Sequence, residues 1–294
     1  MAEAGLLEQT LNLLRPVMPR RFRGDIPVVP VVRLSGVIGF STPLRPGITL
    51  AGVARQLDRA FAHPRARAVA LVINSPGGSA VQSHLVFQRI RQLAAEKQRP
   101  VFAFLEDVAA SGGYMIACAA DEIVADPSSI VGSIGVIGSS FGFVKLIDKI
   151  GVERRIYTAG VNKAMLDPFM PENPDHVARL KAIQSDIHAT FIDLVKSRRG
   201  AKLTETEPDL FSGEYWAASK GIALGLVDRI GDMRAFLRER FGDKVETPLI
   251  SAPRSLFGRA TPGVGIEHLL DRASLADDLV SALEARALWA RYGL

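Results

Sequence analysis

Cysteine is nearly absent from this chain, since Cys118 is the only one among 294 residues. No intramolecular disulfide can form, and a cysteine-rich metal site is excluded. The sequence also has no apolar run of 18 residues, so we predict no membrane-spanning helix. Its start lacks the basic, apolar and small-residue regions of a secretory leader. These absences lead us to expect a cytoplasmic protein without metal or cofactor.

Charge of one sign is not concentrated either. The chain has 36 Lys and Arg against 31 Asp and Glu, a formal net charge of +5, and the basic residues are spread along it. Because a nucleic-acid-binding protein usually shows a basic face and a recognisable motif, we expect no nucleic-acid partner. Hydrophobic residues make up 48% of the chain, which predicts a packed core.

Three regions are expected: an N-terminal appendage (1–27), a main domain (28–241), and a linker with a C-terminal helical extension (242–294). The appendage has leucines at helical spacing, followed by four arginines near two prolines. We interpret residues 1–24 as a frayed helix and linker. Peripheral contact with a membrane or partner is the alternative. For the extension, an amphipathic helix is predicted over 266–288.

Apolar runs of strand length alternate with helical patterns through the main domain. This alternation predicts an α/β fold with a mostly parallel sheet flanked by helices. The expected strands are 28–34, 68–73, 101–105, 122–125 and 154–158. The expected helices are 48–61, 81–96, 112–120, 143–150, 175–199 and 232–241.

Two glycine turns each follow a predicted strand. One turn carries Ser111 followed by Gly112 and Gly113, and the other carries Gly77 and Gly78. Sites in parallel sheets form beyond the carboxyl ends of the strands, where both turns would lie. A serine on such a turn is a typical nucleophile, and backbone N–H groups of Gly78 (or Gly77) and Gly112 would form an oxyanion hole. The pairing predicts acyl transfer, above all peptide hydrolysis.

A serine nucleophile needs a base to remove its proton. No histidine lies between residues 85 and 175, which leaves His84 as a spare candidate. Lys163 stands in a loop with few other charges, whereas the other downstream lysines fall on predicted helices. A lysine acts as a base only when uncharged, and free lysine has a pKa of about 10.4. Because an isolated lysine is more often a surface residue, both candidates stay open at this point.

The motifs LVINSPGG (71–78), ASGGY (110–114), ADP (125–127) and GSIGV (132–136) resemble the signal peptide peptidase A family of serine peptidases. The resemblance covers residues 28–235 and implies the Clp-protease/crotonase fold. It also implies a serine–lysine dyad of Ser111 and Lys163, whose spacing fits single-domain members.

The family forms ring- or dome-shaped oligomers, so the resemblance implies a homo-oligomer with active sites near subunit interfaces. Serine and lysine can then come from neighbouring subunits. The implied substrate is an extended apolar peptide, such as a signal peptide remnant or a misfolded membrane protein. It would bind by strand addition in a groove that includes Gly77, Ser133, Ile134, Gly135 and Val136. Many members carry an N-terminal anchor that we do not predict here, so a soluble or peripherally bound enzyme is expected.

Two alternatives remain. A crotonase-type acyl-CoA enzyme has similar glycine turns, but it often uses a glutamate, and only Glu106 and Asp107 lie near Ser111 in the sequence. The other alternative is an inactive scaffold of the same fold.

Overall fold

The computed structural model describes residues 26–39, 47–204, 210–251, 283 and 285–294. The expectations for residues 1–24 and for most of the helix at 266–288 lie outside this part. Among the described helices, none combines the length and apolar character that a membrane crossing requires.

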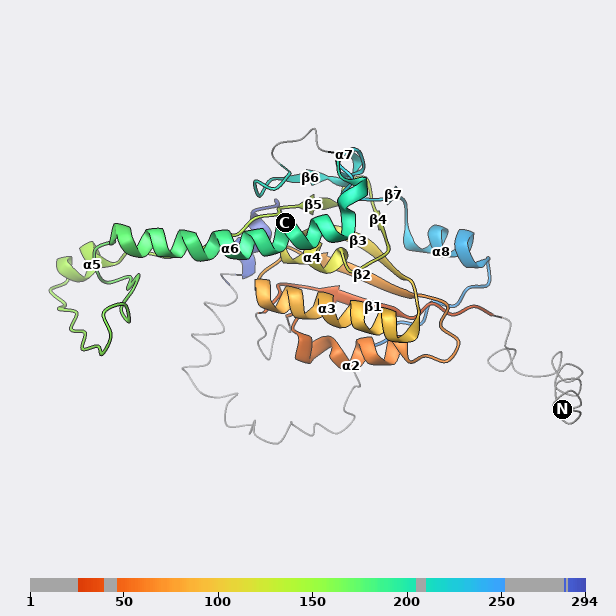
Figure 1. Ribbon diagram of the computed structural model, residues 1–294, viewed down its shortest axis with the longest axis horizontal. Coiled ribbons are helices and arrows are strands. Elements are labelled where there is room, and N and C mark those ends of the chain that lie inside the picture. Colours follow the sequence, from red (N-terminus) through yellow and green to blue (C-terminus); the bar gives the residue numbers. More distant parts are fainter. Residues whose placement is uncertain (1–25, 40–46, 205–209, 252–282, 284) are drawn as a thin grey trace, which may run out of the picture.

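The predicted parallel sheet is confirmed (Figure 1). Its central path is β1-β2-β3-β4-β7, in which all neighbours run parallel. A short strand, β5, pairs in parallel with the end of β3, and β6 pairs with β5 in antiparallel orientation. The strands are β1 (Val31–Ser35), β2 (Val69–Ser75), β3 (Val101–Ala110), β4 (Glu122–Ala125), β5 (Ile130–Gly132), β6 (Tyr215–Ala217) and β7 (Arg229–Ile230).

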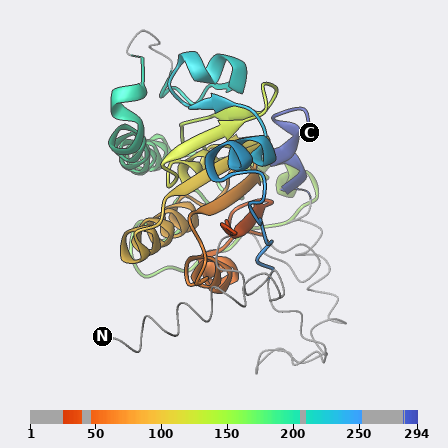
Figure 2. The ribbon, with the colours of Figure 1, turned by 90° about the vertical axis from the view of Figure 1, so that its right-hand side faces the viewer.

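Helices cover both faces of the sheet, as expected for strands whose side chains are apolar on both sides. On one face, α2 (Leu50–Phe61), α3 (Ala80–Lys97) and α4 (Gly112–Ala117) enclose the larger core cluster. On the other face, α8 (Met233–Phe241) packs against a smaller cluster, as the view in Figure 2 shows. Side-chain caps begin the longer helices, for example Ser79 accepting from Gln82 N at the start of α3.

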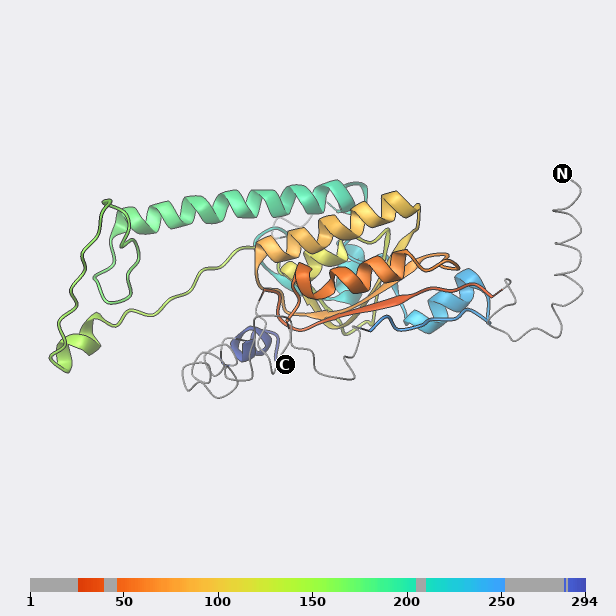
Figure 3. The same ribbon diagram turned by 90° about the horizontal axis from the view of Figure 1, so that it is seen from below.

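One segment leaves this body as an arm, which we define as residues 137–187. It includes α5 (Val144–Lys149) and the first part of α6 (Pro174–Arg199). In α6, the buried residues are Phe191, Leu194, Val195 and Arg199, all in its C-terminal part. The remainder of α6 projects beyond the sheet, with α5 and the loop 150–173 at its far end (Figures 1 and 3).

The base of α6 is pinned by two arginines. Arg198 donates hydrogen bonds to the carbonyls of Cys118 and Ala120. Arg199 is 3% exposed and donates to the Gly225 carbonyl and to Asp228, the latter at 2.7 Å. Burial alone would raise the pKa of Asp228, but hydrogen bonds from Arg199 and other groups outweigh it and the pKa lies below its usual value. The helix that carries the arm is therefore fixed to the body by buried charge.

Two predicted elements need correction. The strand expected at 154–158 is wrong, because this stretch lies in the arm and has no strand beside it to complete a ladder. The strand expected at 101–105 continues to Ala110, past a shift in its register with β2. Glu106 and Asp107, which interrupt its apolar pattern, are paired with Arg33 and Asn74.

The structure also describes the first residues of the predicted linker, up to residue 251. Residues 246–250 run along β1, where Glu246 and Pro248 accept hydrogen bonds from Val29 and Val31. This segment therefore covers the edge of the sheet next to β1.

Candidate active site

Ser111 lies between the end of β3 and the start of α4. Its φ is +53°, a backbone conformation that is strained for any residue other than glycine and that often marks functional sites. Its N–H donates to the Gly132 carbonyl at 2.8 Å, which ties it to the predicted groove. The residue is half-buried, and its side chain does not cap α4. The hydroxyl is thus placed at the carboxyl ends of neighbouring strands, as predicted.

The two glycine turns meet at Ser111. A Cβ placed on Gly77 would lie 2.7 Å from Ser111 Cβ and 3.0 Å from the Gly112 nitrogen. Gly78 has φ +141°, and a Cβ there would lie 2.1 Å from the Ile38 carbonyl oxygen, so no side chain fits. Gly112 begins α4, where the N–H has no acceptor within the helix. The residues expected to supply the nucleophile and the amide donors therefore lie together.

The predicted groove forms a wall beside this cluster. Ser133 and Ile134 are buried, whereas Gly135 and Val136 are half-buried. The Ser133 N–H donates to the Glu214 carbonyl at 2.6 Å, which places β6 behind the wall. Of the residues 132–138, only Gly132 belongs to a strand, as the last residue of β5, and the remainder is irregular.

His188 on α6 is a further residue that contacts the groove wall. The residue is half-buried, and its Nε2 lies 3.1 Å from the Ile134 carbonyl oxygen. The contact joins the base of the arm to the groove wall. The sequence pattern of α6 does not indicate this contact, because the partner of His188 lies in an irregular segment.

Lys163 is exposed. It belongs to the loop 150–173, which lies at the far end of the arm (Figure 3). Nearby, Arg154 pairs with Asp167 at 3.0 Å. A hydrogen bond from the Phe169 N–H, together with Arg154, lowers the pKa of Asp167. Within one chain the structure does not bring Lys163 to Ser111, so the dyad stays a prediction.

The other titratable candidates have partners elsewhere. The His84 ring stacks on Phe87, with ring centroids 6.3 Å apart. Glu106 pairs with Arg33 at 2.5 Å, and Asp107 accepts a hydrogen bond from Asn74 at 2.7 Å. Neither carboxylate therefore stands free as the acid or base that an acyl-CoA enzyme would need beside Ser111.

Tyr292 is a residue near this site that the sequence reasoning missed. Its hydroxyl oxygen lies 3.2 Å from Ser133 Oγ and 3.5 Å from the Pro76 carbonyl oxygen. The helix predicted for this region ended at residue 288, and no motif in the sequence connects Tyr292 with the glycine turns.

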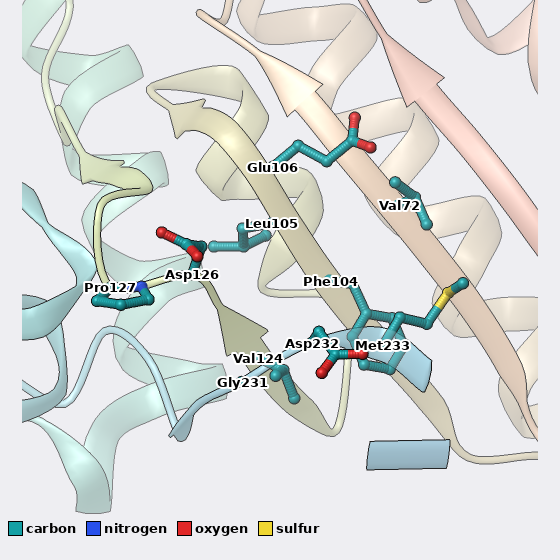
Figure 4. Close-up of a pocket in the computed structure, with 10 residues that line it drawn as sticks. All are labelled: Val72, Phe104, Leu105, Glu106, Val124, Asp126, Pro127, Gly231, Asp232 and Met233. Atoms are coloured by element: carbon teal, nitrogen blue, oxygen red, sulfur yellow. The ribbon is translucent and has the colours of Figure 1, made fainter. Parts of the chain in front are cut away.

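A separate cavity of about 500 Å³ opens on the α8 side of the sheet (Figure 4). Its lining includes Val72, Phe104, Glu106, Asp126 and Asp232, and none of the Ser111 cluster. Within the described ranges, no group of three or more His, Cys, Asp or Glu is placed to hold a metal ion. We assign the cavity no part in the chemistry.

Comparison with known proteins gives several similarities. The chain is 57% identical over 289 residues to a Brucella abortus protein named Na(+)/H(+) antiporter NhaA, a match that covers 96% of this chain but only 39% of that protein. It is 31% identical over 214 residues to the putative protease slr0021 of Synechocystis, covering 70% of this chain and 76% of the relative. A solved structure of the 1510-N membrane-bound stomatin-specific protease matches 78% of this chain with a TM-score of 0.47 and 17% identity.

The antiporter name belongs to the whole Brucella protein, of which this chain spans less than half. The pattern of peptidase family S49 matches residues 94–241, a range that includes Ser111, the groove wall and the arm. Together with the Synechocystis relative, this match confirms the resemblance to signal peptide peptidase A-type serine peptidases. On these grounds the chain belongs to peptidase family S49.

Proposed function

We propose that this protein is a serine endopeptidase in which Ser111 is the nucleophile and Lys163, from a neighbouring copy of the chain, is the general base. The observation that carries the proposal is the position of Ser111, which has a positive φ and lies where both glycine turns and the groove wall meet. Membership of family S49 supports the reaction class.

The reaction would proceed through an acyl-enzyme. Uncharged Lys163 Nζ takes the Ser111 hydroxyl proton as Oγ bonds to the peptide carbonyl carbon. The resulting oxyanion accepts hydrogen bonds from the Gly78 and Gly112 N–H groups, and one such donor is worth about 3 kcal/mol in the transition state. The oxyanion then collapses, the C–N bond breaks, and Lys163 gives its proton to the leaving amine, which leaves an ester on Ser111. Water, activated by the same lysine, hydrolyses the ester and returns Ser111 to its starting state.

The surface of the arm supports a base supplied by a second copy. Large apolar side chains stand exposed on it, including Phe141 at 78% and Val161 at 98% exposure. Exposed apolar surface of this extent is typical of an interaction site. A homo-oligomer would cover it and would bring the Lys163 loop of one copy near Ser111 of another.

The substrate we propose is an extended apolar peptide, such as a signal peptide remnant or a segment of a misfolded membrane protein. The groove wall offers a backbone for strand addition, and half-buried Val136 adds an apolar side chain to that wall. We place the reaction in the cytoplasm and keep peripheral membrane contact through residues 1–24 as the alternative to a plain linker.

The first experiment identifies the catalytic groups. Ser111→Ala should abolish both hydrolysis of an unstructured apolar peptide and labelling by a fluorophosphonate. Lys163→Ala should abolish hydrolysis with the assembly intact. Lys149→Ala is the matched control, because Lys149 is another exposed lysine of the arm. Normal turnover by the Lys163 variant would exclude the dyad, and failure of the wild type to hydrolyse any peptide would favour an inactive scaffold.

A second experiment tests whether the dyad forms between copies. The Ser111→Ala and Lys163→Ala proteins are mixed, dissociated and reassembled. If each site combines residues from two copies, random assembly should restore about a quarter of the wild-type activity. If both residues come from one copy, no site contains an intact pair, and the mixture should stay inactive.

A further inference from the structure

The strand that leads to the nucleophile is longer than its neighbour by two residues. Ile73 of β2 lies opposite Leu105 of β3, but two residues later Ser75 lies opposite Ala109, which is four residues further along β3. The backbone of β3 therefore bulges between these two pairs, over residues 106–108, which we call the β3 bulge. Bulges of this kind redirect the strand that follows them and are common beside active sites.

The β3 bulge determines which residue of β3 meets the glycine turn. If the pairing of Ile73 with Leu105 continued without a bulge, Gly77 would come opposite Ala109. The two extra residues draw the later part of β3 back by about 6.5 Å, at about 3.3 Å per residue. Ser111 then comes opposite Gly77, where a Cβ on the glycine would lie 2.7 Å from Ser111 Cβ. The nucleophile therefore owes its place beside the glycine turn to the bulge.

One side chain of β2 spans the β3 bulge. Asn74 is half-buried and stands between the two register pairs. Its Nδ2 donates a hydrogen bond to Asp107 Oδ2 at 2.7 Å, and its Oδ1 accepts one from the Val108 N–H at 3.3 Å. Both partners belong to the bulge, one through its side chain and one through its backbone. An amide can donate and accept in this way, whereas a carboxylate can only accept.

The other side of the β3 bulge is held by a separate contact. Here the neighbour of β3 changes, since Leu105 is the last residue paired with β4 and Val108 is the first paired with β5. The Leu105 carbonyl accepts a hydrogen bond from Ser129 Oγ at 3.2 Å, and Ser129 is 2% exposed. The bulge is thus fixed from both sides, and the contact from Asn74 comes from the strand that continues into the glycine turn.

We propose that Asn74 is a positioning residue, which fixes the β3 bulge so that Ser111 stands in register with the amide donors of the glycine turn. The proposal rests on the proposed peptidase function. Asn74 acts through the backbone of β3, because its amide is already bonded within the bulge. A misplacement of about 1 Å at a reacting group can cost about a hundredfold in rate, so a loosened bulge should lower kcat. The groove wall has its own contacts with β6 and His188, so KM should change little.

An exchange of the two polar partners tests this role in the full chain. Asn74→Asp keeps the shape but puts a carboxylate against Asp107, so kcat on an unstructured apolar peptide should fall about a hundredfold, with KM within about threefold of wild type. Asp107→Asn should behave like wild type, because its amide oxygen can accept the same hydrogen bond. The variant with both changes restores the bond with donor and acceptor exchanged, so it should recover most of the lost kcat. Asn173→Asp is the matched control, because Asn173 is exposed at the N-cap of α6 and aspartate caps a helix equally well.

Three results would overturn the proposal while leaving the peptidase function in place. They are an unchanged kcat for Asn74→Asp, a lowered kcat that the second change does not restore, and a loss of urea stability without any change in kcat. If Asn74→Asp does not fold, the variant with both changes decides alone, and a low kcat for it would count against the role of Asn74.

Hydrogen exchange separates this proposal from the peptidase function. Asn74→Asp should speed amide exchange at residues 108–112, and the variant with both changes should return it to the wild-type rate. Absence of hydrolysis by the wild type would refute the peptidase function. The exchange rates would still decide whether Asn74 fixes the bulge, since equal rates in Asn74→Asp and wild type would show that it does not.

Discussion

Replacing Arg199 with methionine should destabilise the protein strongly, because its buried guanidinium has three hydrogen bonds. Two go to the Gly225 carbonyl, at 3.0 and 2.6 Å, and one goes to Asp228 at 2.7 Å. Methionine fills similar volume but leaves a half-buried carboxylate with fewer partners. Asp228 would keep only the Lys202 ammonium and the Ile123 N–H.

The expected loss follows from the burial. Breaking a buried ion pair by removing one partner costs about 3–5 kcal/mol, and an unsatisfied carbonyl adds about 1–3 kcal/mol. The partners that Asp228 retains reduce this sum, so we expect a loss of about 3–5 kcal/mol in the free energy of unfolding. In a domain of this size, that corresponds to a fall in Tm of roughly 6–20 °C.

Equilibrium urea denaturation followed by circular dichroism measures this loss. Arg155→Met is the matched control, because Arg155 and its partner Glu153 are 70% and 71% exposed and such a pair contributes less than about 1 kcal/mol. A loss below about 1 kcal/mol for Arg199→Met would refute the view that this cluster fixes the base of α6.

Three further predictions concern the site and the acid stability. Gly78→Ala should abolish activity and lower the yield of folded protein, since its Cβ would meet a carbonyl oxygen at 2.1 Å, whereas Gly142→Ala has open space. His188→Ala should raise KM and cost about 1–3 kcal/mol by leaving the Ile134 carbonyl without its donor, and His188→Gln should recover part of both. Because the folded-state pKa of Asp228 is lowered, its contribution to stability is complete above about pH 4 and is lost as pH falls through the folded pKa.

Each of these has a measurement and a contrary result. The first prediction is contradicted if Gly78→Ala and Gly142→Ala give the same peptide kinetics and the same soluble yield. An unchanged KM for His188→Ala would show that the groove wall does not depend on this contact. Urea titrations between pH 3 and 6 should show a smaller acidic decline for Asp228→Asn than for wild type, and an equal decline would contradict the assignment.

The core of the fold was predictable because its strands are continuous apolar runs and its helices have regular apolar spacing. The length of β3 was not, since Glu106 and Asp107 break its pattern and their partners, Arg33 and Asn74, come from other strands. The strand predicted at 154–158 failed for the opposite reason. Its local propensity was suitable, but no neighbouring strand exists in the arm to pair with it.

In the site, Ser111, Gly78 and Gly112 could be placed together from sequence because parallel strands align their carboxyl ends at one edge. The contacts of His188 and Tyr292 could not, because both join segments that are far apart in the chain and packed against irregular backbone. Periodicity along one helix does not indicate which loop covers it. The approach of Lys163 to Ser111 that we propose involves a second copy, which no pattern within one chain describes.

The N-terminal part of α6 extends well beyond the sheet (Figures 1 and 3). His188 is the first residue of this helix that contacts the groove wall, so about 14 residues (174–187) extend beyond that contact, roughly 21 Å at 1.5 Å per residue. A rotation of α6 by about 10° around this contact would move the far end of the helix by roughly 4 Å. This displacement exceeds the donor–acceptor distance over which a proton is transferred. In the homo-oligomer that we propose, contacts with adjoining copies would hold the tip in place for proton transfer. Turnover per chain should therefore fall on dilution, as the proposed oligomer dissociates.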